Sequence, residues 1–198
     1  KKNKKITPEM FDKIMWALFP YENGLTFKTE ELIKKNKETS QKIRENARLS
    51  EKKWGNKIIG QKNNGNWTTN LGENLVKDVL NLLGETAYKP KKQKNYIPDL
   101  ETDKYIYEVK TRNWTTTGTA GEKVPGVMYK YSEIPTIFKK PLRIVCVAYQ
   151  EWELTYGTTR IFKNVDNTKK EFLMLAKKLK IEYIKFSDLV NQLIIKNN

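Results

Sequence analysis

Three ionisable side chains lie close together in the segment IPDLETDKYIYEVKTRNW, residues 97–114. Asp99, Glu108 and Lys110 interrupt a run of Tyr, Ile and Val that is typical of a β-strand. A carboxylate in a half-buried sheet is unfavourable unless a partner compensates its charge. Carboxylates are also the groups that bind hard divalent cations. The segment therefore suggests a metal-dependent reaction as a hypothesis.

The spacing of these residues predicts that they converge. Residues two apart in a strand share a face, so Glu108 and Lys110 point to the same side. A hairpin that turns about Asp103 and Lys104 would place Asp99 opposite Glu108, with Cβ atoms roughly 4.5–5.5 Å apart. A loop of odd length would shift this register, so the facing pair is a hypothesis about geometry.

Two carboxylates this close repel each other, and one takes up a proton unless a cation lies between them. Mg²⁺ commonly takes one or two carboxylates, keeps several waters and accepts a substrate phosphate. The ion would lower the pKa of a bound water and stabilise charge on a phosphodiester. Lys110 would orient the attacking water or stabilise developing negative charge. The predicted chemistry is Mg²⁺-dependent hydrolysis of a phosphodiester.

The residues PD at 98–99, followed by EVK at 108–110, resemble the motif of the PD-(D/E)xK nuclease superfamily, which includes many type II restriction endonucleases. The resemblance covers an expected helix at 71–84 and a sheet from about 86 to 150. It implies Asp99 and Glu108 as metal ligands, the Val109 carbonyl as a third ligand, and Lys110 as the catalytic lysine.

Glu73 has two interpretations. In the family, the helix that precedes the motif often carries a further acidic residue that faces the site, and Glu73 matches that position. If Asn70 were the N-cap of the helix, Glu73 would instead close a capping box at its third position. The two roles are compatible with each other.

The three motif residues also have purely structural interpretations. Asp99 follows a proline, and aspartate often begins a turn. Glu108 could pair with Lys110 on the surface, where an ion pair contributes little to stability. Lys110 could be a solvated charge on the edge of a sheet.

The charge and the residue counts narrow the class of protein. The chain of 198 residues carries 38 Lys plus Arg against 23 Asp plus Glu, a net charge of +15 that favours a polyanionic partner. Compositional drift towards lysine is the alternative. The absence of histidine excludes Ser-His-Asp and Cys-His hydrolases and His-containing zinc sites. The single cysteine, Cys146, is expected in the core and fits a reducing compartment, the cytoplasm.

Two segments near the motif predict contacts with double-stranded DNA, with ordinary solvated loops as the alternative. They offer basic, hydroxyl and aromatic groups for phosphates and bases. The first comprises Lys89, Lys91, Lys92 and Lys94. The second comprises Arg112, Asn113, Trp114, Thr115, Thr116 and Lys123.

The fold class expected is α/β, with a mixed central sheet flanked by helices, a restriction-endonuclease-like core and an N-terminal, mostly helical region. Residues 1–65 would form a basic region for DNA contact or dimerisation, and residues 66–198 the nuclease domain. Helices are expected at 7–20, 29–50, 70–84, about 126–139, 169–180 and 187–195, and strands around the motif and at 142–150 and 181–186. Residues 51–67, rich in Gly, Asn and Lys, predict a loop or linker.

The function expected is that of a Mg²⁺-dependent endonuclease, of the sequence-specific type II restriction class, acting as a homodimer. A junction-resolvase-like nuclease and a non-catalytic DNA-binding module are the alternatives. No stretch of the sequence approaches the roughly 18 apolar residues of a membrane-spanning helix, so no membrane span is expected.

Overall fold

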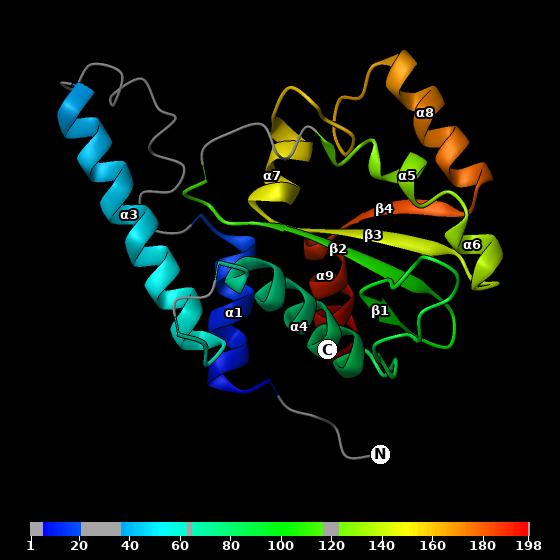
Figure 1. Cartoon of the computed structure of the whole chain (residues 1–198), viewed down its shortest axis with the longest axis horizontal. Coiled ribbons are helices and arrows are strands. Elements are labelled where there is room, and N and C mark those ends of the chain that lie inside the picture. The colour runs from blue at the N-terminus through cyan, green and yellow to red at the C-terminus, as the bar shows by residue number, and fades with distance from the viewer. Residues whose placement is uncertain (1–5, 21–36, 63–64, 117–122, 198) are drawn as a thin grey trace.

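A four-stranded mixed sheet with helices on both faces forms the centre of the molecule in this computed structural model (Figure 1). The structure describes residues 6–20, 37–62, 65–116 and 123–197. The strands are β1 (Leu100–Glu101), β2 (Ile106–Arg112), β3 (Leu142–Ala148) and β4 (Ile181–Lys185), side by side in that order. β1 is antiparallel to β2, whereas β2, β3 and β4 are parallel. The α/β class expected from the sequence is confirmed.

The β1–β2 hairpin has the symmetric turn that the sequence predicts. Leu100 pairs with Tyr107, and Glu101 pairs with Ile106. At the tip, the Thr102 N–H donates to the Tyr105 carbonyl at 2.9 Å. This register places the residue before β1, Asp99, level with Glu108.

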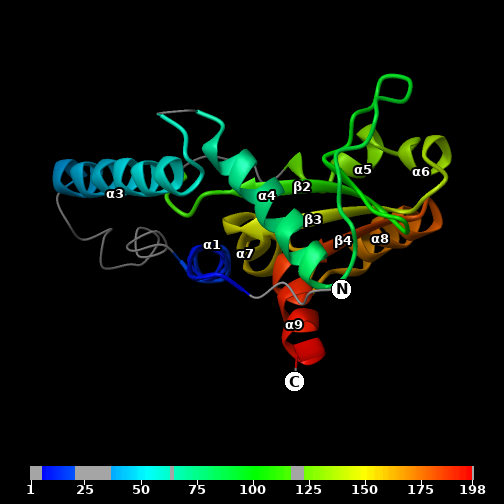
Figure 2. The same cartoon turned by 90° about the horizontal axis from the view of Figure 1, so that it is seen from below.

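Side chains of the central strands alternate between two cores, as the period of a strand requires. Tyr107 and Val109 belong to the core covered by α1 (Pro8–Leu18), α4 (Trp67–Leu82) and α9 (Phe186–Asn197). Ile106 and Ile144 belong to a core on the other face, beneath α5 (Val127–Lys130), α6 (Ile134–Ile137) and α8 (Asn167–Lys178). The two sets of helices lie on opposite sides of the sheet (Figures 1 and 2).

The long helix α3 (Lys37–Ile58) contradicts part of the sequence prediction. Residues 51–58, expected as a loop, continue this helix, while residues 29–36 of the expected helix lie outside the described residues. The reason is close packing: a Cβ atom at Gly55 would lie 2.0 Å from Cε3 of Trp67. The glycine that suggested a loop therefore allows two helices to approach each other. The amino-terminal part of α3 extends away from the body (Figures 1 and 2).

Helix α4 begins earlier than the sequence suggests, with Asn66 as its N-cap. Trp67 is buried and packs against Trp16, with ring centroids 5.8 Å apart, which adds a turn at the amino-terminal end. Asn70 is therefore inside the helix, and its side chain donates to Gln61 at 3.3 Å. The capping-box interpretation of Glu73 is wrong.

The remaining elements follow the predicted order with local differences. Thr7 caps α1 as expected, its hydroxyl accepting from the Met10 N–H at 3.2 Å. The helix expected around 126–139 is two short helices, α5 and α6, and α7 (Tyr149–Tyr156) was not predicted. Ser187 was expected to cap the last helix, but it lies inside α9 and its N–H donates to the Glu151 carboxylate at 3.0 Å. Cys146 is fully buried, as predicted.

None of the helices in the described ranges combines the length and the apolar character needed to cross a membrane.

Candidate active site

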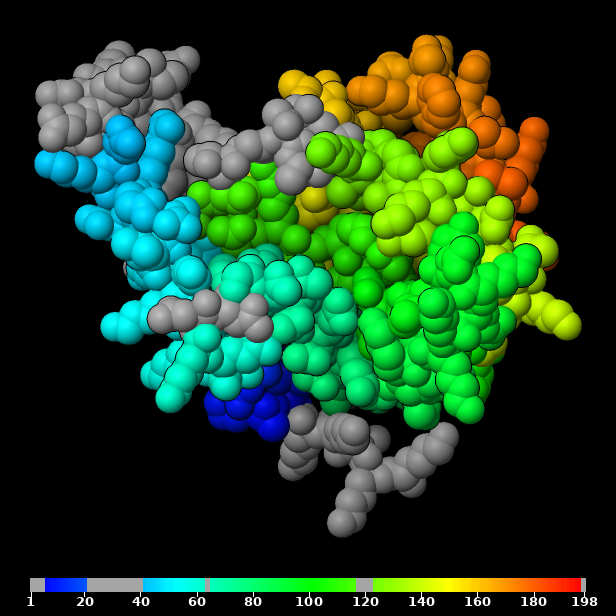
Figure 3. All heavy atoms as spheres, in the orientation of Figure 1, coloured from blue at the N-terminus to red at the C-terminus, as the bar shows by residue number. Residues whose placement is uncertain are grey.

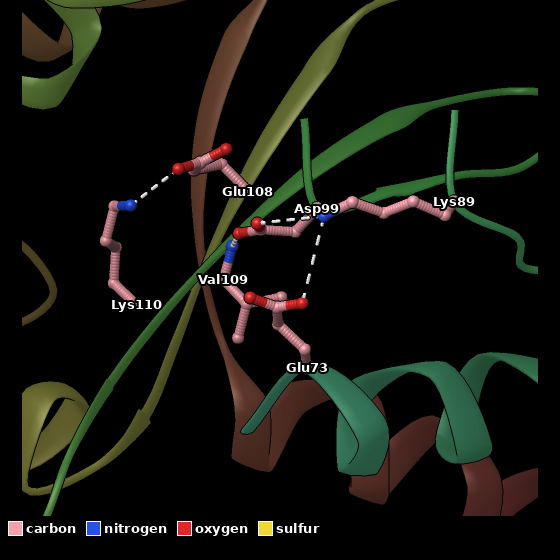
Figure 4. Close-up of polar contacts among 6 residues, drawn as sticks. All are labelled: Glu73, Lys89, Asp99, Glu108, Val109 and Lys110. Atoms are coloured by element: carbon pink, nitrogen blue, oxygen red, sulfur yellow. Dashed lines mark hydrogen bonds and ion pairs between the residues drawn. The ribbon is translucent and has the colours of Figure 1, made fainter. Parts of the chain in front are cut away.

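An open edge of β2 forms one wall of the site. β1 pairs only with Ile106 and Tyr107, so in the described part of the chain no strand covers the edge of β2 away from β3 from Glu108 onwards. Asp99 occupies this edge: its N–H donates to the Tyr107 carbonyl at 3.1 Å, and its Oδ2 accepts from the Val109 N–H at 2.8 Å (Figure 4). The N–H and C=O of one strand residue point to the same side. The Val109 carbonyl therefore faces the same edge as the Asp99 carboxylate.

Glu108 and Lys110 lie on one face of β2, as their spacing predicts. The Glu108 side chain is buried, with 5% of the residue exposed, and its Oε1 accepts from Lys110 Nζ at 2.6 Å. Lys110 remains partly exposed, so its ammonium is accessible from the surface. The motif thus brings a buried carboxylate and an accessible ammonium to adjacent positions.

Glu73 reaches the same region from α4 (Figure 4). The helix lies close to β2 because residue 72 is glycine: a Cβ atom there would lie 1.7 Å from Thr111 Oγ1. Lys89 lies between the helix and the hairpin, with Nζ at 3.6 Å from Asp99 Oδ1 and 3.9 Å from Glu73 Oε2. Lys89 was predicted to contact DNA, but in the structure it forms ion pairs with two carboxylates of the candidate site.

The electrostatics of the site show an excess of negative charge. Burial raises the pKa of Glu108 and the charge of Asp99 raises it further, against the opposing effects of Lys110 and Tyr131. Burial likewise raises the pKa of Glu73, followed by the charge of Asp99, while Lys89 opposes the shift. The two lysines thus compensate the three carboxylates only in part. A further cation would be favourable at this point.

Tyr131 is a residue of the site that the sequence analysis did not select. It follows α5, and its hydroxyl is hydrogen-bonded to the Glu108 carboxylate. The Lys110 ammonium lies 5.7 Å from the centre of its ring, and Tyr96 packs edge-on against it at 6.3 Å. The residue therefore contacts both members of the Glu108–Lys110 pair. Only the packing of α5 and α6 on the sheet brings it there.

The donor groups fit a hard cation such as Mg²⁺, the ion expected from the sequence. They are carboxylate and carbonyl oxygens, which this ion prefers. As the side chains lie, no three His, Cys, Asp or Glu residues in the described ranges are grouped so as to hold one ion together. Mg²⁺ commonly takes only one or two protein carboxylates and fills its other positions with water and phosphate. Asp99, Glu108 and the Val109 carbonyl offer oxygen donors of this kind.

The lysines predicted to contact DNA separate into two groups. Lys91, Lys92 and Lys94 are exposed on the loop 89–97, which extends from the body between α4 and β1 (Figure 2). A bridge between Gln93 and Tyr96 closes the tip of this loop. Its three lysines are therefore accessible to a polyanion, whereas the exposed Lys89 is engaged by Asp99 and Glu73.

The second predicted DNA segment lies mostly inside the protein. Arg112 is buried, forms an ion pair with Glu153 and lies 5.0 Å from the centre of the Tyr149 ring. Trp114 and Thr115 are also buried, so these three side chains are not exposed to a ligand. Residues 117–122 of this loop lie outside the described residues. Asn113 and Thr116 are partly exposed, and Lys123 is exposed.

A buried carboxylate explains why that segment turns inwards. Glu51 of α3 is fully buried. Its two oxygens accept from Trp16 Nε1 at 2.9 Å, the Trp114 N–H at 2.9 Å, the Thr115 N–H at 3.0 Å, Thr115 Oγ1 at 2.6 Å and Asn113 Nδ2 at 3.3 Å. Five donors around one carboxylate compensate its burial. Glu51 thus fastens α1 and α3 to the end of the strand that carries Lys110.

Comparisons of this chain with protein-family models, with curated proteins and with solved structures found no match. An assignment of function therefore depends on the chemistry of the site.

Proposed function

We propose that the protein is a Mg²⁺-dependent DNA endonuclease of the PD-(D/E)xK type, with a restriction-endonuclease-like core. The observation that supports it is the convergence of Asp99, Glu108 and Lys110 at the open edge of β2. In the structure, the Asp99 carboxylate accepts a hydrogen bond from the backbone N–H of Val109, the residue after Glu108. Lys110 Nζ lies 2.6 Å from the Glu108 carboxylate. Glu73 adds a third carboxylate from α4.

In this proposal Asp99, Glu108 and the Val109 carbonyl hold the ion, with Glu73 assisting. When bound, Mg²⁺ supplies a water of lowered pKa and positive charge against the scissile phosphate. Lys110 orients the attacking water and stabilises the negative charge that develops on the phosphate. Tyr131 keeps the Glu108 carboxylate in place through its hydrogen bond.

The substrate proposed is double-stranded DNA. The net charge of +15 and the exposed lysines of the loop 89–97 favour a polyanion. Cleavage of both strands by a protein with one site per chain implies a symmetric dimer. Recognition of a specific sequence is proposed from the resemblance to type II restriction endonucleases.

Incubation of the protein with a long duplex of mixed sequence and Mg²⁺, followed by mapping of fragment ends, tests the proposal. We expect discrete fragments from the wild type and none from Asp99→Ala or Lys110→Ala. Asp103→Ala and Lys104→Ala at the exposed hairpin tip are matched controls that should cut normally. Full cleavage by either site variant would exclude this site. Selective cutting of branched DNA would indicate a junction-resolvase-like nuclease instead.

A non-catalytic DNA-binding module is a second candidate, favoured by one observation. Lys89 and Lys110 pair with the acidic groups, as they would in a site that had become purely structural. Binding of duplex DNA in both Ca²⁺ and Mg²⁺, with no Mg²⁺-dependent cutting on linear or branched substrates, would indicate the module.

A further inference from the structure

A recess of about 370 Å³ lies beside the candidate active site, where the end of β2 meets α3 and α4. We call it the flanking recess. It is lined by Arg48, Lys52, Gly65, Trp67, Thr68, Asn113 and Thr116. The segments that form it adjoin on the face shown in Figure 3, where α3 is cyan, α4 teal and the end of β2 green.

The lining of the flanking recess is chemically suited to an anion. It contains two cationic side chains, Arg48 and Lys52, and no carboxylate. In the part of the chain that the structure describes, Lys52 has no ion-pair partner, and the hydroxyls of Thr68 and Thr116 have no hydrogen-bond partner. These groups can donate to phosphate oxygens without losing contacts inside the protein.

Arg48 has a partner, but a weak one. Its guanidinium is bonded to Glu45 at 2.6 Å and 2.9 Å, with about half of each side chain exposed. Exposed pairs of this kind contribute little to stability. Arg48 can therefore exchange Glu45 for a phosphate at small cost.

One wall of the flanking recess is held by hydrogen bonds. The buried carboxylate of Glu51 accepts from Asn113, which lines the recess, and from Thr115. Both donors of the Asn113 amide are used, one on Glu51 at 3.3 Å and one on Thr115 at 3.2 Å. Asn113 thus shapes the wall and contributes no further donor, and the loss of freedom on binding falls mainly on Arg48 and Lys52.

Two elements connect the flanking recess to the candidate active site. Helix α4 carries Thr68 at the recess and Glu73 at the site, five residues apart, which is about 7.5 Å along the helix axis. Strand β2 carries Lys110 at the site and leads to Asn113 at the recess, three residues on, which is about 10 Å. Both estimates place the flanking recess about 10 Å or less from the candidate active site, near enough for one DNA strand to reach both.

We propose that the flanking recess binds a backbone phosphate of the DNA strand that lies across the active site, near the phosphate at Lys110. This inference rests on the proposed function, because the strand is assumed to lie on the site. The contact is with phosphate and is independent of base sequence. It fixes where along the strand the reacting phosphate lies.

Binding of a fluorescent duplex, measured by polarisation at a series of KCl concentrations in Ca²⁺, tests this proposal. Lys52→Met keeps the side-chain shape and removes the charge, and Lys53→Met removes the same charge from the exposed neighbouring residue, which does not line the recess. We expect Lys52→Met to weaken binding by about tenfold and to lower the salt slope by about one, and Lys53→Met to leave both nearly unchanged. Equal effects of the two variants would overturn the proposal.

A second arm identifies the contact itself. Single methylphosphonate substitutions along one strand each remove one phosphate charge. At one position the substitution should weaken binding by the wild type and leave the Lys52→Met variant unaffected, because the partner charge is already missing. Thr68→Val with Thr116→Val should weaken binding without changing the salt slope. Additive effects of Lys52→Met at every position of the strand would contradict a defined phosphate site.

The failure of this inference and the failure of the proposed function are distinguishable. If Lys52→Met weakens DNA binding and lowers the salt slope as expected, but no Mg²⁺-dependent cutting occurs, the phosphate-site proposal is supported and the nuclease proposal is rejected. If the protein cuts DNA but Lys52→Met and Lys53→Met have the same DNA affinity and salt slope, the nuclease proposal is supported and the phosphate-site proposal is rejected.

Discussion

The Asp99 carboxylate accepts a hydrogen bond from the Val109 backbone N–H, with 2.8 Å between Oδ2 and the nitrogen. The first acidic residue of the site is therefore attached to the strand that carries the second. Its other oxygen, Oδ1, faces the Lys89 ammonium at 3.6 Å. One oxygen thus positions the side chain, and the other faces an exposed lysine that an incoming cation can displace.

Replacement of Glu108 tests whether the candidate active site carries an excess of negative charge. Its pKa is raised from the ordinary value of 4.5, so the folded protein holds this proton more tightly than the unfolded chain does. Ionisation of Glu108 therefore lowers stability as the pH rises from 4.5 through the raised pKa. We expect Glu108→Gln to raise the Tm of the metal-free protein by a few degrees at pH 7 and to have little effect below pH 4.

Thermal unfolding in EDTA across this pH range measures the effect. Glu133→Gln, at an exposed position before α6, is the control and should change nothing at any pH. A variant less stable than the wild type at pH 7 would contradict the charge excess.

Tyr131→Phe isolates the effect of the Tyr131 hydroxyl on the pKa of Glu108. The hydrogen bond from Tyr131 lowers the pKa of Glu108, so its loss should raise that pKa. The ring beside Lys110 remains. We expect weaker Mg²⁺ binding near neutral pH and a cleavage profile whose acidic limb moves to higher pH, because Glu108 then binds its proton more tightly. Calorimetric titration with Mg²⁺ and pH–rate profiles provide the measurements.

Tyr129→Phe is the matched control, since Tyr129 is 87% exposed and lies on α5, the short helix that Tyr131 follows. Identical Mg²⁺ affinity and pH profiles for the two tyrosine variants would show that Tyr131 has no influence on Glu108.

Lys89→Met tests whether this lysine competes with the ion. Its ammonium contacts both Asp99 and Glu73, so a bound cation and Lys89 use the same oxygens. We expect the variant to bind Mg²⁺ more tightly, by less than about tenfold because the lysine is largely exposed and such pairs are weak. Lys91→Met on the same loop should leave the affinity unchanged. Weaker Mg²⁺ binding by Lys89→Met would show that the lysine supports the site.

Gly72→Ala tests the approach of α4 to β2. The new methyl group would lie 1.7 Å from Thr111 Oγ1, so the helix or the strand must move. We expect a loss of about 1–3 kcal/mol in the free energy of unfolding by urea, the usual cost of overpacking. Gly65→Ala, where no atom lies within 4 Å of the added carbon, should change stability by less than about 0.5 kcal/mol. A neutral Gly72→Ala would show that the contact is loose.

The Asp99–Glu108–Lys110 arrangement follows from local rules, and the sequence alone predicted it. The period of a strand sets the face that Glu108 and Lys110 share. A symmetric turn between Asp99 and Glu108 sets their register, and the pairing of Leu100 with Tyr107 confirms it. The α/β class and most elements were likewise predicted from hydrophobic periodicity and turn residues, because these patterns depend on neighbours in the chain.

Only the tertiary structure decided which other residues join the site or leave the surface. Glu73, which the resemblance already implied, faces Asp99 from a helix that Gly72 allows to approach β2, and Lys89 joins them from the loop that follows. Tyr131 lies beside Glu108 because α5 and α6 pack on the sheet. Arg112 is buried and forms an ion pair with Glu153. Such contacts depend on long-range packing, which no spacing along the chain encodes. The sequence by itself therefore determined the motif, and the fold determined its surroundings.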